Sequence, residues 1–142
     1  MLKLFLADCL IKISYLSWAM YTANVLYKLD KLPLIIIESL EAINATDIVL
    51  YDTRGKSPFY DYFVISSVTS DRQLQGAIAH VQDDLSKAKY QVARIEGKNS
   101  NSWVLIDSKD IIVNVFTKEE RVYYNLEKML VEIEQIKLEE LK

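Results

Sequence analysis

Apolar residues recur with helical spacing in three stretches of the chain. The first lies between Pro33, which suits the first turn of a helix because its missing N–H needs no partner there, and Asn44, which predicts a stop. Its apolar stripe comprises Leu34, Ile37 (or Ile36), Leu40 and Ile43. The other two stretches open with capping boxes at residues 70–73 and 117–120. The pattern therefore predicts helices over 33–43, 70–88 and 117–133.

Runs rich in β-branched and aromatic residues predict five strands, at residues 47–52, 60–68, 90–95, 103–106 and 111–116. Short polar loops join the last three strands, so these pair as antiparallel neighbours, whereas the helix between the second and third strands requires a crossover. The expected fold class is α/β, with a single mixed five-stranded sheet flanked by helices in the order α-β-β-α-β-β-β-α.

The length of 142 residues and the apolar content of 51% indicate one folded domain, which we place at residues 32–131, followed by a helical tail at 132–142. Residues 1–31 form an N-terminal extension with two open interpretations, an added helix or a start upstream of the true one at Met20. Their longest uncharged run, 13–27, is too short for a spanning helix, so no membrane association is expected. The expected compartment is the cytoplasm, or an organelle if residues 1–31 are a targeting segment.

Charge is divided unevenly between the extension and the rest of the chain. Residues 1–31 contain four lysines and two aspartates, leaving +2, whereas the remaining residues contain 13 basic and 18 acidic side chains, leaving −5. An acidic domain disfavours direct, sequence-specific contact with nucleic acid, which depends on clustered Lys and Arg. It favours a basic protein partner, which opposite potentials would steer to it.

The residues that most enzymes use are poorly represented. Cys9 is the single cysteine and His80 the single histidine, which we expect on the solvated side of its helix. The three glycines, at positions 55, 76 and 97, are too scattered to form a phosphate-binding loop. No catalytic residue, cofactor or metal is therefore expected.

Aromatic residues concentrate where turns meet strands. Trp103 begins its strand directly after the polar loop 98–102, so we expect it to be partly exposed. Since Trp and Tyr are enriched at binding hot spots, this pattern favours a recognition surface over an active site.

Several stretches then resemble, in order and spacing, those of one family. They are 51–55 (YDTRG), 61–65 (DYFVI), 69–73 (TSDRQ), 94–97 (RIEG), 103–107 (WVLID), 110–113 (DIIV), 115–116 (VF) and 121–127 (RVYYNLE). From about residue 34 to 130 the chain resembles the ribosomal silencing factor family, also called the Iojap or RsfS family.

The resemblance implies a nucleotidyltransferase-like fold without catalytic activity. It implies binding to the large ribosomal subunit through ribosomal protein fourteen, which obstructs joining of the small subunit and represses translation. It also implies a homodimer when free, and a role for Trp103 in the ribosomal-protein contact. At position 114 the family usually has histidine, whereas this chain has Asn114, which retains only a structural hydrogen-bonding role.

Trp103 is accordingly the expected aromatic anchor, and Trp103→Ala is expected to abolish subunit binding while leaving the fold intact. Its expected neighbours in the partner-binding site are Tyr62, Asp71, Arg72, Glu96, Tyr123 and Tyr124. Two alternatives remain: a large-subunit assembly factor without a silencing role, and a nucleotidyltransferase-type enzyme. The second is disfavoured because Ser66 and Ser67 have no adjacent glycine and the chain has no Asp-x-Asp pair.

Overall fold

The computed structural model describes residues 31–92 and 94–142, and residues 32–142 form one compact unit. The expectations for the extension, including Cys9 and Met20, lie outside the described residues. None of the described helices is long and apolar enough to cross a membrane.

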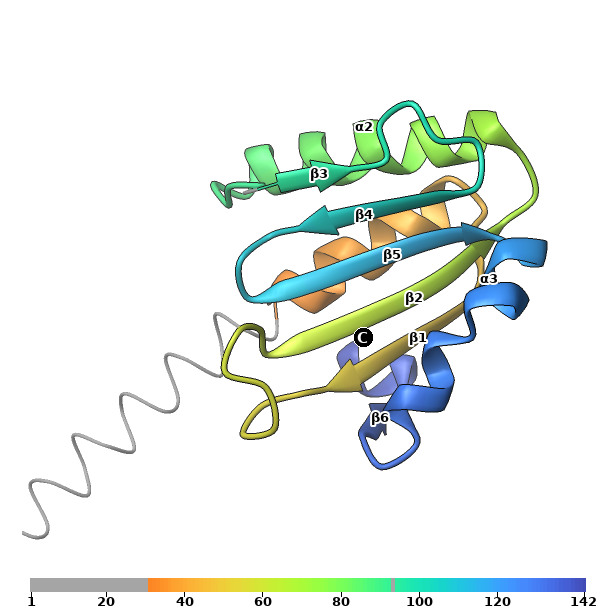
Figure 1. Ribbon diagram of the computed structural model, residues 1–142. Coiled ribbons are helices and arrows are strands. Elements are labelled where there is room, and N and C mark those ends of the chain that lie inside the picture. Colours follow the sequence, from red (N-terminus) through yellow and green to blue (C-terminus); the bar gives the residue numbers. More distant parts are fainter. Residues whose placement is uncertain (1–30, 93) are drawn as a thin grey trace, which may run out of the picture. The chain divides into compact units, whose positions relative to one another are not determined.

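A helix over residues 31–42 is followed by β1 (Thr46–Asp52), β2 (Tyr62–Val68), α2 (Asp71–Lys87), β3 (Arg94–Glu96), β4 (Trp103–Asp107), β5 (Ile111–Thr117), α3 (Lys118–Tyr124), the 3-10 helix η1 (Leu126–Leu130), β6 (Glu134–Ile136) and the 3-10 helix η2 (Leu138–Leu141). The strands form one sheet in the order β3-β4-β5-β2-β1-β6 (Figure 1). β2 and β5 run parallel and the other neighbours antiparallel, so the predicted mixed α/β fold is confirmed.

The predicted count of five strands was wrong, because the tail contributes a sixth. Glu134–Ile136 pairs with β1, although the tail was expected to be helical. Without β6, β1 would expose unpaired backbone groups along the sheet edge, and satisfying them outweighs the helical propensity of the tail. The third strand also starts later than predicted, at Arg94.

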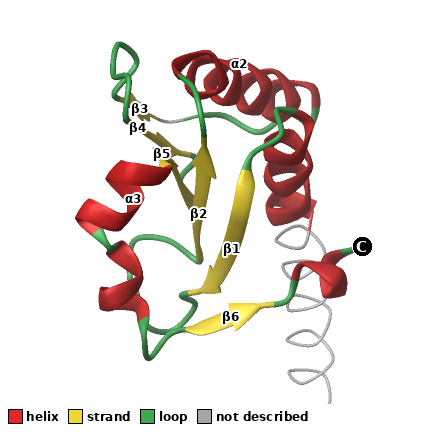
Figure 2. Cartoon of the chain, turned by 90° about the vertical axis from the view of Figure 1, so that its right-hand side faces the viewer, coloured by secondary structure: helices red, strands yellow, loops and turns green. Residues whose placement is uncertain are grey.

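The helix over residues 31–42 and α2 cover one face of the sheet, and α3 and η1 lie on the other (Figure 2). Strand residues that point toward the first pair of helices are fully buried, namely Leu50, Val64, Val104, Ile106, Val113 and Val115. Burying a side chain of this size stabilises a fold by about 1.5–3 kcal/mol. Because side chains alternate along a strand, the residues between these buried positions face α3.

The predicted caps position α2. Ser70 accepts a hydrogen bond from the backbone N–H of Gln73 at 3.2 Å. The side chain of Gln73 accepts from the backbone N–H of Thr69 at 2.8 Å and donates to the carbonyl of Ile43 at 3.0 Å. Asn44, the predicted stop of the preceding helix, has φ of 60°. One glutamine therefore joins the start of α2 to the end of that helix.

The predicted helix over 117–133 was too long. Thr117 caps α3 as expected, but the helix ends at Tyr124 because Asn125 adopts the left-handed conformation (φ 46°, ψ 56°), which asparagine tolerates. This turn brings Leu126, Leu130 and Ile133 against a buried cluster of Tyr51, Ile65 and Phe116.

We expect Gly76→Ala to stabilise the protein by about 0.5–1 kcal/mol, because alanine is the better helix former and a Cβ at Gly76 meets only the Ile43 Cγ2 methyl, at 3.5 Å. Urea denaturation measures the change. Gly97→Ala is the control of opposite sign, since Gly97 has φ of +80° and its Cβ would clash with the carbonyl oxygen of Trp103. A lower urea midpoint for Gly76→Ala would contradict the packing described between α2 and Ile43.

Candidate functional site

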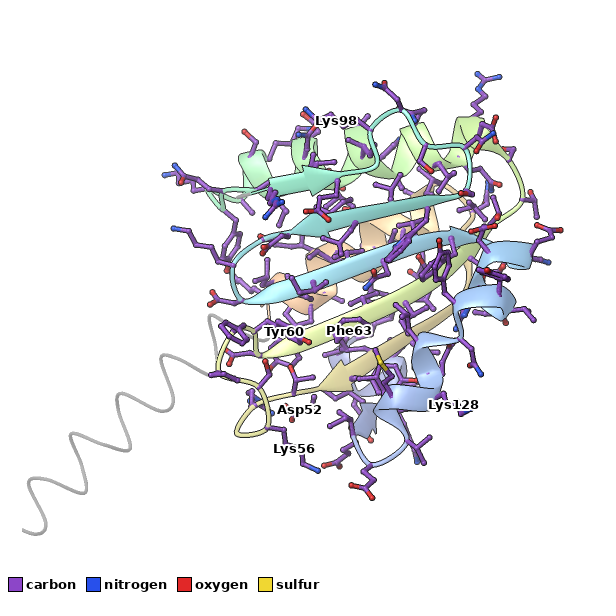
Figure 3. All side chains as sticks on the ribbon, viewed as in Figure 1. Asp52, Lys56, Tyr60, Phe63, Lys98 and Lys128 are labelled. Carbon is purple, nitrogen blue, oxygen red and sulfur yellow. The ribbon has the colours of Figure 1, made fainter. Side chains whose placement is uncertain are left out.

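The strand registers align side chains in rows across the face of the sheet that bears α3. Trp103 of β4 lies opposite Phe116 of β5, and Leu105 lies opposite Asn114. Figure 3 shows Phe63 and Tyr60 on a part of this face that α3 leaves open; their ring centroids are 5.7 Å apart. The face therefore has one end beneath α3 and one uncovered end.

Aromatic rings connect the core to the surface at the α3 end. The Trp103 ring stacks on the Phe116 ring, with centroids 5.0 Å apart. The ring centroid of Tyr124 lies 4.9 Å from that of Trp103. Tyr123 meets Tyr124 edge to face at 5.2 Å. Phe116 is buried, Trp103 is partly exposed as predicted, and Tyr123 is 79% exposed. The cluster thus presents aromatic surface on a rigid base.

A buried amide orients the Trp103 ring. The indole N–H donates to Oδ1 of Asn114 at 3.1 Å, and Nδ2 of Asn114 donates to the carbonyl of Val64 at 3.4 Å. Asn114 is only 1% exposed, so this hydrogen bond is protected from water. The structural hydrogen-bonding role predicted for Asn114 is confirmed.

A pocket of about 230 Å³ opens between α3 and the β3–β4 hairpin. It is lined by Glu96, Gly97, Ser100, Ser102, Trp103, Leu105, Glu120 and Tyr124. Its rim is ordered by Ser100, whose hydroxyl accepts the backbone N–H groups of Ser102 and Trp103, each at 3.1 Å. Two carboxylates and two aromatic rings therefore share one small concavity.

Arg121 holds α3 in place over the sheet. Its guanidinium donates to the carbonyl of Asp47 at 2.6 Å and to the hydroxyl of Ser67 at 2.8 Å, and it pairs with Glu127 at 2.6 Å. Its side chain is only 13% exposed, so these bonds tie α3 to β1 and β2. They also set the position of Tyr124, which lies at the end of the same helix.

The structure brings together three of the predicted site residues, Glu96, Trp103 and Tyr124, and places Tyr123 beside them. Asp71 and Arg72 are exposed in the first turn of α2, on the opposite side of the sheet from α3 (Figure 2). They do not line the pocket.

The prediction that Tyr62 belongs to the binding surface was wrong. Tyr62 is 2% exposed because it alternates with Phe63 on β2 and faces the covered side of the sheet. The Arg54 guanidinium lies 5.3 Å from the centre of its ring and hydrogen-bonds Asp52, which lowers the pKa of that carboxyl. Tyr62 therefore stabilises the opposite end of the sheet.

Sequence reasoning missed Glu120 and Leu105 as pocket residues. Glu120 was assigned only to the capping box, and nothing local indicates that it lines the same pocket as Glu96. The sequence signal for the hairpin at the edge of the pocket is Gly97. Its positive φ shows that glycine is needed for the turn at the end of β3.

Among the described residues, no three His, Cys, Asp or Glu side chains are grouped as a metal site would require. His80 is exposed on α2, as predicted, and Ser66 and Ser67 are buried, their hydroxyls bonded to the carbonyl of Asn114 and to Arg121. The pocket offers recognition chemistry, namely aromatic faces and acceptor oxygens, rather than an activated nucleophile.

Known proteins resemble this chain in both sequence and fold. The Bacillus subtilis protein named "Ribosomal silencing factor RsfS" is 42% identical over 85 residues, 60% of this chain and 72% of that protein. The mouse protein "Mitochondrial assembly of ribosomal large subunit protein 1" is 29% identical over 97 residues, 66% of this chain and 42% of that protein. A crystal structure of a Bacillus halodurans protein superposes with a TM-score of 0.67 and 30% identity, covering 75% of this chain and 97% of that one.

The sequence model of one family, described as "Ribosomal silencing factor during starvation", matches residues 28–142, which include every residue that the structure describes. The chain therefore belongs to the ribosomal silencing factor family.

Proposed function

We propose that this protein represses translation by binding ribosomal protein fourteen on the large ribosomal subunit and blocking the joining of the small subunit. The observation that carries the proposal is the exposed aromatic surface of Trp103, Tyr123 and Tyr124 beside a pocket rimmed by carboxylates. Family membership supports the ribosomal target.

The chemistry of this surface suits a basic protein. Trp and Tyr supply rigid apolar contact, and Glu96 and Glu120 add negative potential where the domain already carries a net −5 outside residues 1–31. Repression then needs no catalysis: an interface of standard size, about 1,200–2,000 Å², excludes a second subunit from the same place.

Asp71 and Arg72 belong to the periphery of the proposed interface. β2 ends at Val68 opposite Thr117, so α2 and α3 begin at the same end of the sheet, on opposite faces. A partner centred on Trp103 would reach them only at its edge. The proposed site of action is the cytoplasm, or an organelle if residues 1–31 are a targeting segment.

A role in large-subunit assembly without silencing is the second candidate, favoured by the name of the mouse relative. Both functions use the same contact with the large subunit, so subunit joining is the measurement that separates them.

We further propose that the free protein forms a homodimer through the apolar side chains that it exposes on α3 and after it, namely Val122, Met129 and Val131. Contiguous exposed apolar patches are typical of protein contact surfaces, and each of these three side chains is at least 76% exposed.

The contacts of the Trp103 ring change the expectation that Trp103→Ala leaves the fold unaffected. We expect this variant to destabilise the protein by about 3 kcal/mol, because it removes the stack on Phe116 and leaves Oδ1 of Asn114 without its donor. Trp103→Phe retains a ring and should cost about 1 kcal/mol. Urea denaturation followed by circular dichroism measures both. Equal stability of the wild type and Trp103→Ala would show that the ring is not part of the core.

We therefore expect Tyr123→Ala to be the cleaner test of binding, since Tyr123 is 79% exposed and its loss costs the fold little. Co-sedimentation with purified large subunits should show affinity at least tenfold weaker than that of the wild type. Phe59→Ala is the matched control, because Phe59 is 82% exposed on the loop between β1 and β2, at the opposite end of the sheet.

Mixing both subunits with the wild-type protein should yield fewer joined ribosomes. Binding to the large subunit without loss of joining would favour the assembly function, and no binding to the large subunit would contradict both proposals.

Val122→Asp should convert the free dimer to a monomer in analytical ultracentrifugation, because it places a charge in the apolar contact. Ala79→Asp, which adds the same charge on the exposed side of α2, should leave the dimer unchanged. A wild-type monomer, or equal effects of the two variants, would contradict the proposed dimer surface.

A further inference from the structure

The pocket between α3 and the β3–β4 hairpin has the size of a single side chain. Its volume is about 230 Å³, below the range of about 300–1,000 Å³ that is usual for cofactors and other small molecules. A site of this size within a protein-binding surface is suited to one residue of the partner.

The walls of the pocket select a cation. The aromatic side chains of Trp103 and Tyr124 line the pocket. A guanidinium or ammonium group close to the face of an aromatic ring is attracted by the ring electrons, most strongly by those of tryptophan. No basic side chain is among the described residues that line the pocket, whereas two carboxylates, those of Glu96 and Glu120, are.

Glu120 supplies the matching charge. Its side chain is half-buried in the pocket, and no described residue forms a hydrogen bond or ion pair with its carboxylate. Glu96, across the pocket, already binds the guanidinium of Arg94 at 2.6 Å. Both side chains of this ion pair are exposed, so the pair contributes little free energy. Replacing Arg94 by the guanidinium of a partner therefore costs little binding free energy.

The site is also preorganised. Ser100 fixes the rim through two backbone N–H groups, Asn114 orients the Trp103 ring, and Gly97 allows the close approach of the hairpin. Binding therefore does not require the protein to order these groups, which reduces the entropic cost of association.

We propose that this pocket binds one arginine side chain of the basic protein partner, with the guanidinium against Trp103 and Tyr124 and bonded to Glu120. The planar guanidinium can stack on a ring while forming paired hydrogen bonds to a carboxylate, which an ammonium group cannot do. The proposal rests on the proposed function for the identity of the partner, but not for the chemistry of the pocket.

The test is an NMR titration of the full-length, ¹⁵N-labelled protein with N-acetyl-arginine amide, following the indole N–H of Trp103. Trp18→Phe assigns this signal, because the chain has two tryptophans. We expect a saturable shift with the arginine compound and at least fivefold weaker binding of N-acetyl-citrulline amide, its uncharged analogue. Equal binding of citrulline would overturn the proposal, and N-acetyl-lysine amide binding as tightly as arginine would overturn the preference for a guanidinium.

Glu120→Gln should weaken arginine binding by about tenfold. Glu119→Gln is the matched control, because it removes the same charge from the neighbouring residue of α3, which is exposed and does not line the pocket; its affinity should stay within twofold of the wild type. Equal effects of the two variants would overturn the role of Glu120.

Co-sedimentation with large subunits separates this proposal from the proposed function. If Tyr123→Ala loses binding while Glu120→Gln binds as well as Glu119→Gln, the pocket proposal fails and docking stands. If the wild type does not bind the subunit, the proposed function fails, and the arginine titration still decides what the pocket binds.

Discussion

The parallel pairing of β2 with β5 is the constraint on which the rest of the structure depends. It aligns Tyr62 with Ile111 and Val68 with Thr117, across about fifty residues of intervening chain. This register places Asn114 beside Ile65 and Phe116 beside Ser67. It also starts α3 close to Ser67 and Asp47, where Arg121 binds both. A shift of one residue would turn every side chain of β5 to the other face.

Asn114 shows how a polar residue within the sheet can specify a surface. Buried polar groups are costly unless they are hydrogen-bonded, and here the amide is satisfied by the Trp103 indole and by the Val64 carbonyl. The arrangement favours one orientation of the Trp103 ring, and thereby fixes the aromatic wall against which Tyr124 packs. Stability and recognition depend on the same contacts, so substitution of Trp103 alone cannot separate them.

The tail and α3 affect the surface of the domain in different ways. β6 closes the free edge of β1, and the pair between Lys142 and Glu41 holds the end of the chain to the first described helix. α3 is a capped helix of seven residues that leaves its own Val122 and Tyr123 exposed. Exposed aromatic surface therefore remains where a partner is proposed, while β6 pairs with Leu50, Tyr51 and Asp52 of β1.

The sequence by itself determined what depends on neighbours along the chain. The caps at Ser70 and Thr117, the stop at Asn44 and the partial exposure of Trp103 follow from local patterns, and the structure confirms them. Only the tertiary structure decided that Tyr62 is buried, that the tail adds a strand, and that Glu120 and Glu96 line one pocket. Each of these depends on contacts between segments far apart in sequence, and such contacts override local propensity because they bury surface or satisfy backbone groups that no neighbour along the chain can reach.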